Sequence, residues 1–115
     1  MGRKDRLVLD IVRTDTTFAR RAIGGEAAWV GKCLHCGAQL VVMADGRTSA
    51  TIEHIVPRHQ GGDDALENVA LACARCNAEK GVRHDWRRRG EGRAAEVIEA
   101  LLARRRERWR APEDA

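Results

Sequence analysis

The chain has 115 residues and a mass of 12.8 kDa, which corresponds to one domain and excludes a two-domain enzyme. Its 21 basic and 17 acidic side chains give a net charge of +4, and its mean hydropathy of −0.47 indicates a soluble, basic protein. No apolar run in the chain approaches the roughly 20 residues that span a bilayer, and no secretion signal is recognisable at its start, so we expect a cytoplasmic protein that makes no membrane contact.

The first part of the chain, residues 1–32, is predicted to be a flanking segment outside the core. Within it, Asp15–Ile23 is predicted to form a short helix, with Asp15 or Thr16 as its N-terminal cap and two glycines at its end. The rest of the chain divides into a core from residue 33 to 81 and a basic C-terminal helix and tail from residue 82 to 115.

The core alternates between short apolar runs and turn residues. Gln39–Met43 and Thr51–Ile55 are predicted to be strands, with a glycine-containing turn between them. A loop rich in glycine and aspartate then leads to a third short strand at 69–72. Ala74–Lys80 is predicted to be a helix that stops at Gly81, because glycine readily adopts the left-handed conformation just past a helix end.

The C-terminal part carries most of the surplus positive charge. Residues 83–110 contain ten arginines and five acids, whereas residues 1–82 are close to neutral. Apolar residues recur here at spacings of three and four, which predicts an amphipathic helix: Ala95, Ile98, Leu101 and Leu102. Arginines at the end of a helix suit its macrodipole, and such clusters also mark nucleic-acid surfaces, so both interpretations stay open.

Two Cys-x-x-Cys pairs, Cys33/Cys36 and Cys73/Cys76, are separated by 36 residues. Each pair can turn two thiolates toward one point, and two such knuckles complete the four-sulfur shell that a structural Zn²⁺ favours. A closed shell predicts a site that stabilises a small core rather than one that catalyses. A redox motif or merely buried thiols are the less favoured alternatives, and His35 is expected at the surface or beside a ligand rather than as a ligand.

A longer pattern runs through and between the two knuckles. Its parts, in order, are Cys-x-x-Cys, Glu53-His54-Ile55-Val56-Pro57, Gly61-Gly62, Asn68 before an apolar strand, and Cys-x-x-Cys-Asn77-x-x-Lys80. Together these 49 residues, from Cys33 to Gly81, resemble the HNH endonuclease family. The resemblance implies an α+β fold of the small ββα-metal type, in which two strands flank a glycine-rich loop and a helix follows. A structural zinc bound by the four cysteines would tie the flanks together, with further helices on either side.

Phosphodiester hydrolysis needs a base that deprotonates water and a cation that neutralises charge on the phosphate. Glu53 and His54 are neighbours on a predicted strand, so their side chains point to opposite faces and cannot act side by side on one atom. The resemblance implies that His54 is the general base, and an imidazole can accept a proton near neutral pH.

The resemblance also implies that Glu53 and Asn77 hold a catalytic divalent cation. Oxygen ligands in small number suit Mg²⁺, and Mn²⁺ fits as well. Many members of the family carry Asp at the first position and His at the second, so this chain departs from the pattern at both. The neutral amide of Asn77 shifts the preference further toward Mg²⁺ and away from Zn²⁺, Ni²⁺ or Co²⁺.

Four further residues have predicted roles. Asn68 lies 14 residues after His54, and its amide can bond loop backbone groups on both sides, which favours a positioning role. Arg58 and Lys80 are candidates for binding phosphates, although exposed basic side chains also serve solubility. His59 is expected to contact a phosphate or face solvent rather than bind the metal. His84, beyond the pattern, has no assigned role.

The function predicted from these residues is a metal-dependent DNA endonuclease that nicks or cuts both strands. Its affinity for DNA would come mainly from phosphate contacts by the basic tail and would depend strongly on salt. Nothing in the chain resembles a sequence-reading module, so we expect weak or no sequence preference unless a partner protein supplies it, and protein partners stay unknown. Two alternatives are a zinc-stabilised nucleic-acid-binding module that does not cut, and an interaction protein that pairs through the apolar stripe of its C-terminal helix.

Overall fold

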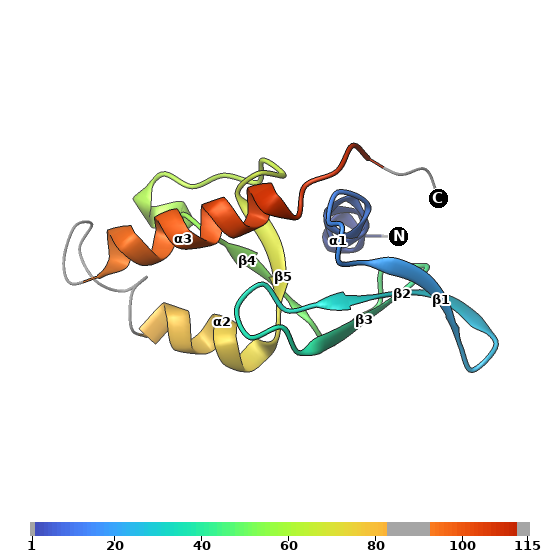
Figure 1. Ribbon diagram of the computed structural model, residues 1–115. Coiled ribbons are helices and arrows are strands. Elements are labelled where there is room, and N and C mark those ends of the chain that lie inside the picture. The colour runs from blue at the N-terminus through green and yellow to red at the C-terminus, as the bar shows by residue number, and fades with distance from the viewer. Residues whose placement is uncertain (1, 83–92, 113–115) are drawn as a thin grey trace.

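The computed structural model describes residues 2–82 and 93–112 and shows a mixed α+β fold (Figure 1). The elements in chain order are α1 (Arg3–Arg13), β1 (Ala19–Ile23), β2 (Glu26–Lys32), β3 (Gln39–Met43), β4 (Thr51–His54), the 3-10 turn η1 (Arg58–Gln60), β5 (Val69–Ala72), α2 (Ala74–Lys80) and α3 (Ala94–Glu107). The strands form two antiparallel sheets, β1-β2-β3 and β4-β5. Among the described residues, no helix combines the length and the apolar character needed to span a membrane.

The β4-β5 hairpin and α2 form the ββα unit that positions the candidate site. Strand β4 pairs with β5 in a register that sets Glu53 opposite Ala70 and His54 opposite Val69. The predicted strands at 39–43 and 69–72 and the predicted helix at 74–80 are confirmed, and the strand expected at 51–55 ends one residue earlier. The structure therefore has the order strand, loop, strand, helix of the ββα-metal fold.

Both faces of β5 are buried, because a helix covers each of them (Figure 1). Val69 and Leu71 pack in a core cluster with the apolar side of α1. Ala70 points the other way and packs with Leu34 and with Leu101 of α3, as the two-residue period of a strand requires. The apolar stripe of α3 is therefore used inside the molecule, which removes the basis for an interaction protein that pairs through it.

The predicted helix at Asp15–Ile23 is wrong. Ala19–Ile23 is strand β1, and the two glycines after it form the hairpin turn to β2, with φ of 56° and 82°. The side chain of Asp15 accepts hydrogen bonds from the backbone and hydroxyl of Thr17, so it closes a local turn instead of capping a helix. Gly81 also differs from its prediction, since its φ of −54° and ψ of −52° are right-handed helical values.

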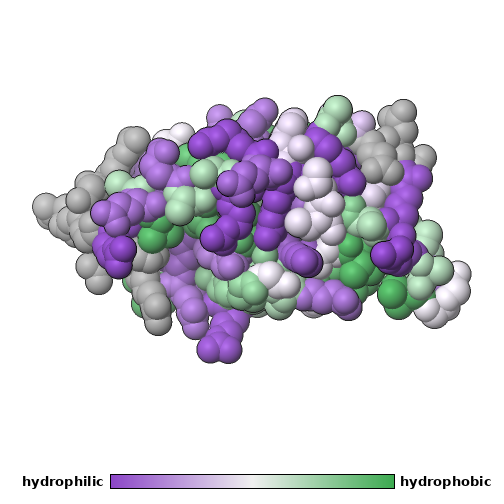
Figure 2. Space-filling model, viewed as in Figure 1, coloured by the Kyte–Doolittle hydropathy of each residue, from purple (hydrophilic) through white to green (hydrophobic). Residues whose placement is uncertain are grey.

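The arginines at the end of α3 have a different role from the phosphate binding expected of the basic tail. Four of them donate hydrogen bonds to main-chain carbonyls elsewhere in the fold: Arg104 to Leu34, Arg105 to Val69, Arg108 to Lys32 and Arg110 to Val12. These hydrogen bonds connect the C-terminal end of α3 to the rest of the fold, whereas the side chain of Arg106 is exposed. Hydrophilic side chains cover much of the face in Figure 2, including the region over α3. Arg93, at the start of α3, pairs with Glu96 at 3.2 Å. The remaining arginines of the tail, and His84, lie in 83–92, outside the described residues.

Candidate active site and metal centre

The two knuckles bring their four cysteines to one point. Cys33 and Cys36 lie in the turn after β2, and Cys73 and Cys76 lie at the start of α2. The four Sγ atoms all lie within 4.8 Å of one another, and those of Cys36 and Cys73 are 4.0 Å apart. A tetrahedral zinc with bonds of about 2.3 Å needs sulfurs separated by about 3.8 Å, so the four thiols fit a structural zinc site.

Main-chain N–H groups prepare this cluster for thiolates. The N–H of Cys73 donates to the sulfur of Cys33 at 3.3 Å, and the N–H of Ala38 donates to that of Cys36 at 3.4 Å. Burial alone would raise the pKa of Cys33, but hydrogen bonds from the backbone of Cys36 and Cys73 outweigh it and lower that pKa to about 7. Burial and the neighbouring sulfurs raise the pKa of Cys76. Four thiolates at such distances require a cation between them.

A groove of about 480 Å³ opens between β4, the turn η1 and α2. His54 reaches it from the end of β4, Arg58 and His59 from η1, and Asn77 from α2. The Nδ2 of Asn77 donates to the hydroxyl of Thr51 at 3.1 Å and to the carbonyl of Ile52 at 3.4 Å. In the described part of the chain no hydrogen bond engages its Oδ1, so this amide oxygen remains available to a ligand of the groove.

The imidazole of His54 is anchored by Asp64 from the loop that connects β4 and β5. Its Nε2 lies 2.7 Å from Oδ1 of Asp64, whose carboxylate also accepts from Arg58 at 2.7 Å. The hydrogen bond from His54 and the charge of Arg58 hold the pKa of the Asp64 carboxyl below its usual value. The ionised carboxylate can only accept, so Nε2 of His54 carries the proton and donates it in this hydrogen bond. In the neutral imidazole, Nδ1 is then the acceptor nitrogen.

Asn68 and two glycines shape that loop. The side chain of Asn68 accepts from the N–H of Val56 at 2.8 Å and donates to the carbonyls of Val56 at 3.1 Å and Asp63 at 2.9 Å. Gly61 has a φ of 93°, and a Cβ on Gly62 would lie 1.7 Å from the carbonyl oxygen of Val56. Asn68 thus makes the backbone bonds expected from the sequence, and the glycines allow the chain to pass close enough for them.

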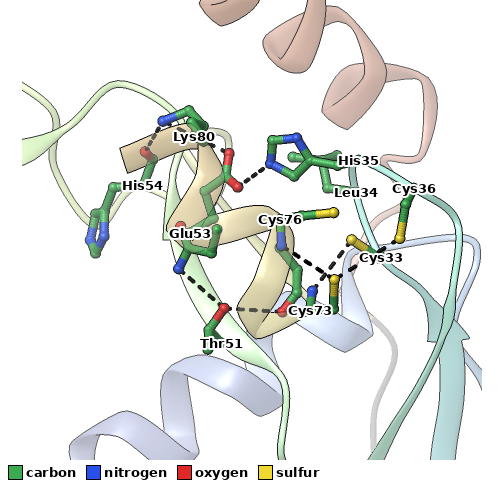
Figure 3. A network of polar contacts seen from close by, with 12 residues as sticks. Cys33, Leu34, His35, Cys36, Thr51, Glu53, His54, Cys73, Cys76 and Lys80 are labelled. Carbon is green, nitrogen blue, oxygen red and sulfur yellow. Dashed lines mark hydrogen bonds and ion pairs between the residues drawn. The ribbon is translucent and has the colours of Figure 1, made fainter. Parts of the chain in front are cut away.

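Glu53 projects from the opposite face of β4, away from His54 (Figure 3). Its side chain is fully buried, with Oε1 in contact with Nε2 of His35 and Oε2 at 4.0 Å from Nζ of Lys80. Lys80 is itself buried and donates to the carbonyl of His54 at 3.3 Å. His35, Glu53 and Lys80 form a buried polar cluster that joins the first knuckle, β4 and α2.

One expectation for the site differs from the structure, and another stays a prediction. Of the two expected cation ligands, Asn77 lines the groove and Glu53 does not. The ligand roles that the resemblance implies for Glu53 and Asn77, and the catalytic cation itself, stay predictions. Lys80 is 3% exposed and turned toward Glu53, so it is not presented to a phosphate as expected.

Two residues of the site were missed at the level of sequence. Asp64 stands in a run of turn-forming residues, Gly61-Gly62-Asp63-Asp64, and no local signal distinguishes it from Asp63. His35 was expected at the surface or beside a ligand, and its contact with Glu53 joins residues 18 positions apart. Both contacts depend on the tertiary fold, which brings His35 of the first knuckle to Glu53 and Asp64 of the loop to His54.

Comparison with known proteins agrees with this geometry. Residues 33–83 match the family model described as HNH endonuclease. The matched segment includes both cysteine knuckles and the whole ββα unit. No significant match was found among curated proteins or among solved structures.

Proposed function

We propose that the protein is a metal-dependent endonuclease that hydrolyses phosphodiester bonds in DNA, with His54 as the general base. The observation that carries the proposal is the position of His54 inside an HNH domain. Its imidazole lines an open groove, its Nε2 is held by Asp64, and its Nδ1 has no hydrogen-bond partner in the described part of the chain. A ring nitrogen without a protein partner in an open groove is free to accept a proton from water.

The proposed reaction begins when Nδ1 of His54 takes a proton from a water molecule in the groove. The water oxygen forms a bond to phosphorus, and the bond between phosphorus and one ester oxygen breaks. The departing oxygen receives a proton from solvent. Asp64 acts as a positioning residue, since its carboxylate fixes the imidazole ring and stabilises the positive charge that the ring acquires. Arg58 and His59 border the same groove, where they would bind oxygens of the DNA phosphates.

Two metal ions have separate roles in this proposal. Zinc, held by the four thiolates, joins the two knuckles and leaves no open position for a substrate. A hard divalent cation, Mg²⁺ or Mn²⁺, would neutralise charge on the phosphoryl oxygens, and Asn77 is the side chain of the groove that offers it an oxygen.

Cleavage of a supercoiled plasmid tests the function. The zinc-loaded protein and its His54→Ala variant are incubated with plasmid and Mg²⁺ at low salt, after zinc content and circular dichroism show that both are folded. We expect relaxed or linear plasmid with the wild type and none with the variant. If neither protein cuts with Mg²⁺ or Mn²⁺ while both bind the plasmid, the chain is a zinc-stabilised binding module instead.

The identity of the catalytic cation is tested by titration. Because the groove offers an amide oxygen and no thiolate, we expect cleavage with Mg²⁺ and Mn²⁺ and little with Ni²⁺ or Co²⁺. The protein is first loaded with zinc, and its zinc content is measured again after each titration. Strongest cleavage with Ni²⁺ and none with Mg²⁺ would contradict the oxygen-donor site.

A further inference from the structure

Helix α1 lies outside the segment that matches the HNH family, yet it borders the candidate site. The register of the hairpin sets His54 and Ile52 on the same face as Val69 and Leu71, which is the face that α1 covers. A second hollow of about 380 Å³ lies on this side. It is lined from three parts of the chain: by Arg3, Lys4 and Leu7 of α1, by Ile52 and His54 of β4, and by Arg58 and Asp64. His54 thus stands between the groove and this second hollow.

Positive side chains converge on the second hollow from distant parts of the sequence. Arg3 lies 3.5 Å from Oδ2 of Asp64, and Arg58 lies 2.7 Å from Oδ1 of the same carboxylate. The side chain of Arg3 is 89% exposed and that of Arg58 is 65% exposed, so both can exchange this partner for another anion. Lys4 is also exposed at the edge of the hollow. One loop carboxylate therefore occupies the point where two guanidinium groups meet.

The position of these cations is fixed by packing. Val8, Leu9, Ile11 and Val12 bury one side of α1 against β5 and the three-stranded sheet. Arg3 and Lys4 are consequently held at the border of the hollow by a docked helix. A basic pair that served only solubility would need no such placement beside His54.

We propose that the hollow between α1 and β4 is a second contact for the DNA backbone, in which Arg3, Lys4 and Arg58 bind a phosphate next to the scissile one. This inference rests on the proposed function and extends it. In the free protein, the carboxylate of Asp64 binds Arg3 and Arg58 at the position that this phosphate would take. A phosphate group accepts hydrogen bonds from guanidinium groups in the same way as a carboxylate does.

DNA binding by the full-length, zinc-loaded protein tests this contact. Fluorescence anisotropy with a labelled duplex, without added divalent cation, gives the Kd over a series of KCl concentrations. The variant is Arg3→Gln/Lys4→Gln. The control is Arg20→Gln/Arg21→Gln, a pair of adjacent exposed cations on β1 that line a different hollow, beside Arg13 at the C-terminal end of α1. We expect the α1 pair to raise the Kd about tenfold at low salt and to reduce the salt slope by about 1 to 2, whereas the control pair changes both less.

The possible results separate the two proposals. If the wild type binds no DNA, the proposed function fails. If the wild type binds and the two double variants lose affinity equally, Arg3 and Lys4 contribute only through the net charge of the protein. The proposed second phosphate contact is then wrong. A further comparison uses Asp64→Asn and Asp63→Asn, which remove the same charge at adjacent positions. We expect Asp64→Asn to lower the Kd more than Asp63→Asn, because it also releases Arg3 and Arg58. Equal effects of the two substitutions would contradict the proposal that Asp64 occupies the phosphate position in the free protein.

Discussion

Asp64 connects the chemistry of the groove to the electrostatics around it. Its carboxylate orients His54 through Nε2 and is itself bound by Arg58 and Arg3. A single loop residue thereby sets the tautomer of His54, the proposed base, and pairs with two nearby cations. Such a carboxylate acts through the imidazole rather than on the substrate, so its removal should affect turnover more than substrate binding.

Substitution of Asp64 tests this positioning role. We expect Asp64→Ala to lower the kcat for plasmid cleavage by about tenfold or more without raising KM. Asp64→Asn should retain more activity, because an amide oxygen can still accept the hydrogen bond from Nε2. Steady-state kinetics of the three proteins measures both constants. Equal losses in the two variants, or a loss confined to KM, would show that Asp64 does not act by orienting His54.

Glu53 is expected to serve stability in the arrangement that the structure shows. Its carboxylate is the charged partner of a buried ammonium, so Glu53→Gln leaves Lys80 without an opposing charge. We expect the free energy of unfolding to fall by about 3 kcal/mol. Glu79→Gln, on the exposed side of α2, is the control and should cost far less. Urea denaturation measures both. Unchanged stability together with a raised Mg²⁺ requirement for cleavage would instead make Glu53 a cation ligand.

At the scale of elements, the loop between β4 and β5 determines where the imidazole of His54 is held. Asn68 ties Val56 to Asp63 across the loop, and Gly62 allows the chain to pass the carbonyl of Val56. Gly61 and Gly62 are each required for a different structural reason. Gly61 needs its positive φ but has open space around it, whereas Gly62 has no space for a side chain.

Alanine at each glycine separates these two reasons. Gly61→Ala should cost about 1 to 2 kcal/mol through its left-handed backbone. We expect Gly62→Ala to cost more and also to lower cleavage, because a Cβ there would displace Val56 and the amide of Asn68. Thermal unfolding and plasmid cleavage are measured for both variants. A larger loss of stability in Gly61→Ala would show that the close approach at Gly62 is relieved cheaply.

The sequence predicted the elements whose pattern is local and missed those that depend on pairing. Helix α2 and strand β5 were predictable, because cysteine spacing and an apolar run mark them. Strand β1 was not, since its exposed residues carry no alternation and only pairing with β2 makes it a strand. The same holds for the site. Strand geometry predicted that Glu53 and His54 diverge, but the partners His35 and Asp64 follow from the tertiary fold.

At the scale of the whole molecule, arginines connect the segments on either side to the domain that matches the HNH family model, residues 33–83. Arg105 is fully buried and donates to the carbonyls of Leu66 and Val69 in the domain and of Thr14 after α1. Burial lowers its pKa, while the nearby charges of Asp15 and Glu67 oppose that effect. One side chain thus joins α1, β5 and α3 at the end of the hairpin away from the zinc site.

Removal of this side chain should loosen all three elements together. Arg105→Met removes hydrogen bonds to the carbonyls of Leu66, Val69 and Thr14, and we expect the free energy of unfolding to fall by about 3 to 5 kcal/mol. The control is Arg106→Met, one residue along, where the side chain is exposed and the expected change is within about 0.5 kcal/mol. Both variants are unfolded in urea at equal zinc content. Because Arg105 keeps α1 docked, its loss should also weaken DNA binding through Arg3 and Lys4. Equal stability of the Arg105→Met and Arg106→Met variants would mean that the apolar core alone holds α1 in place.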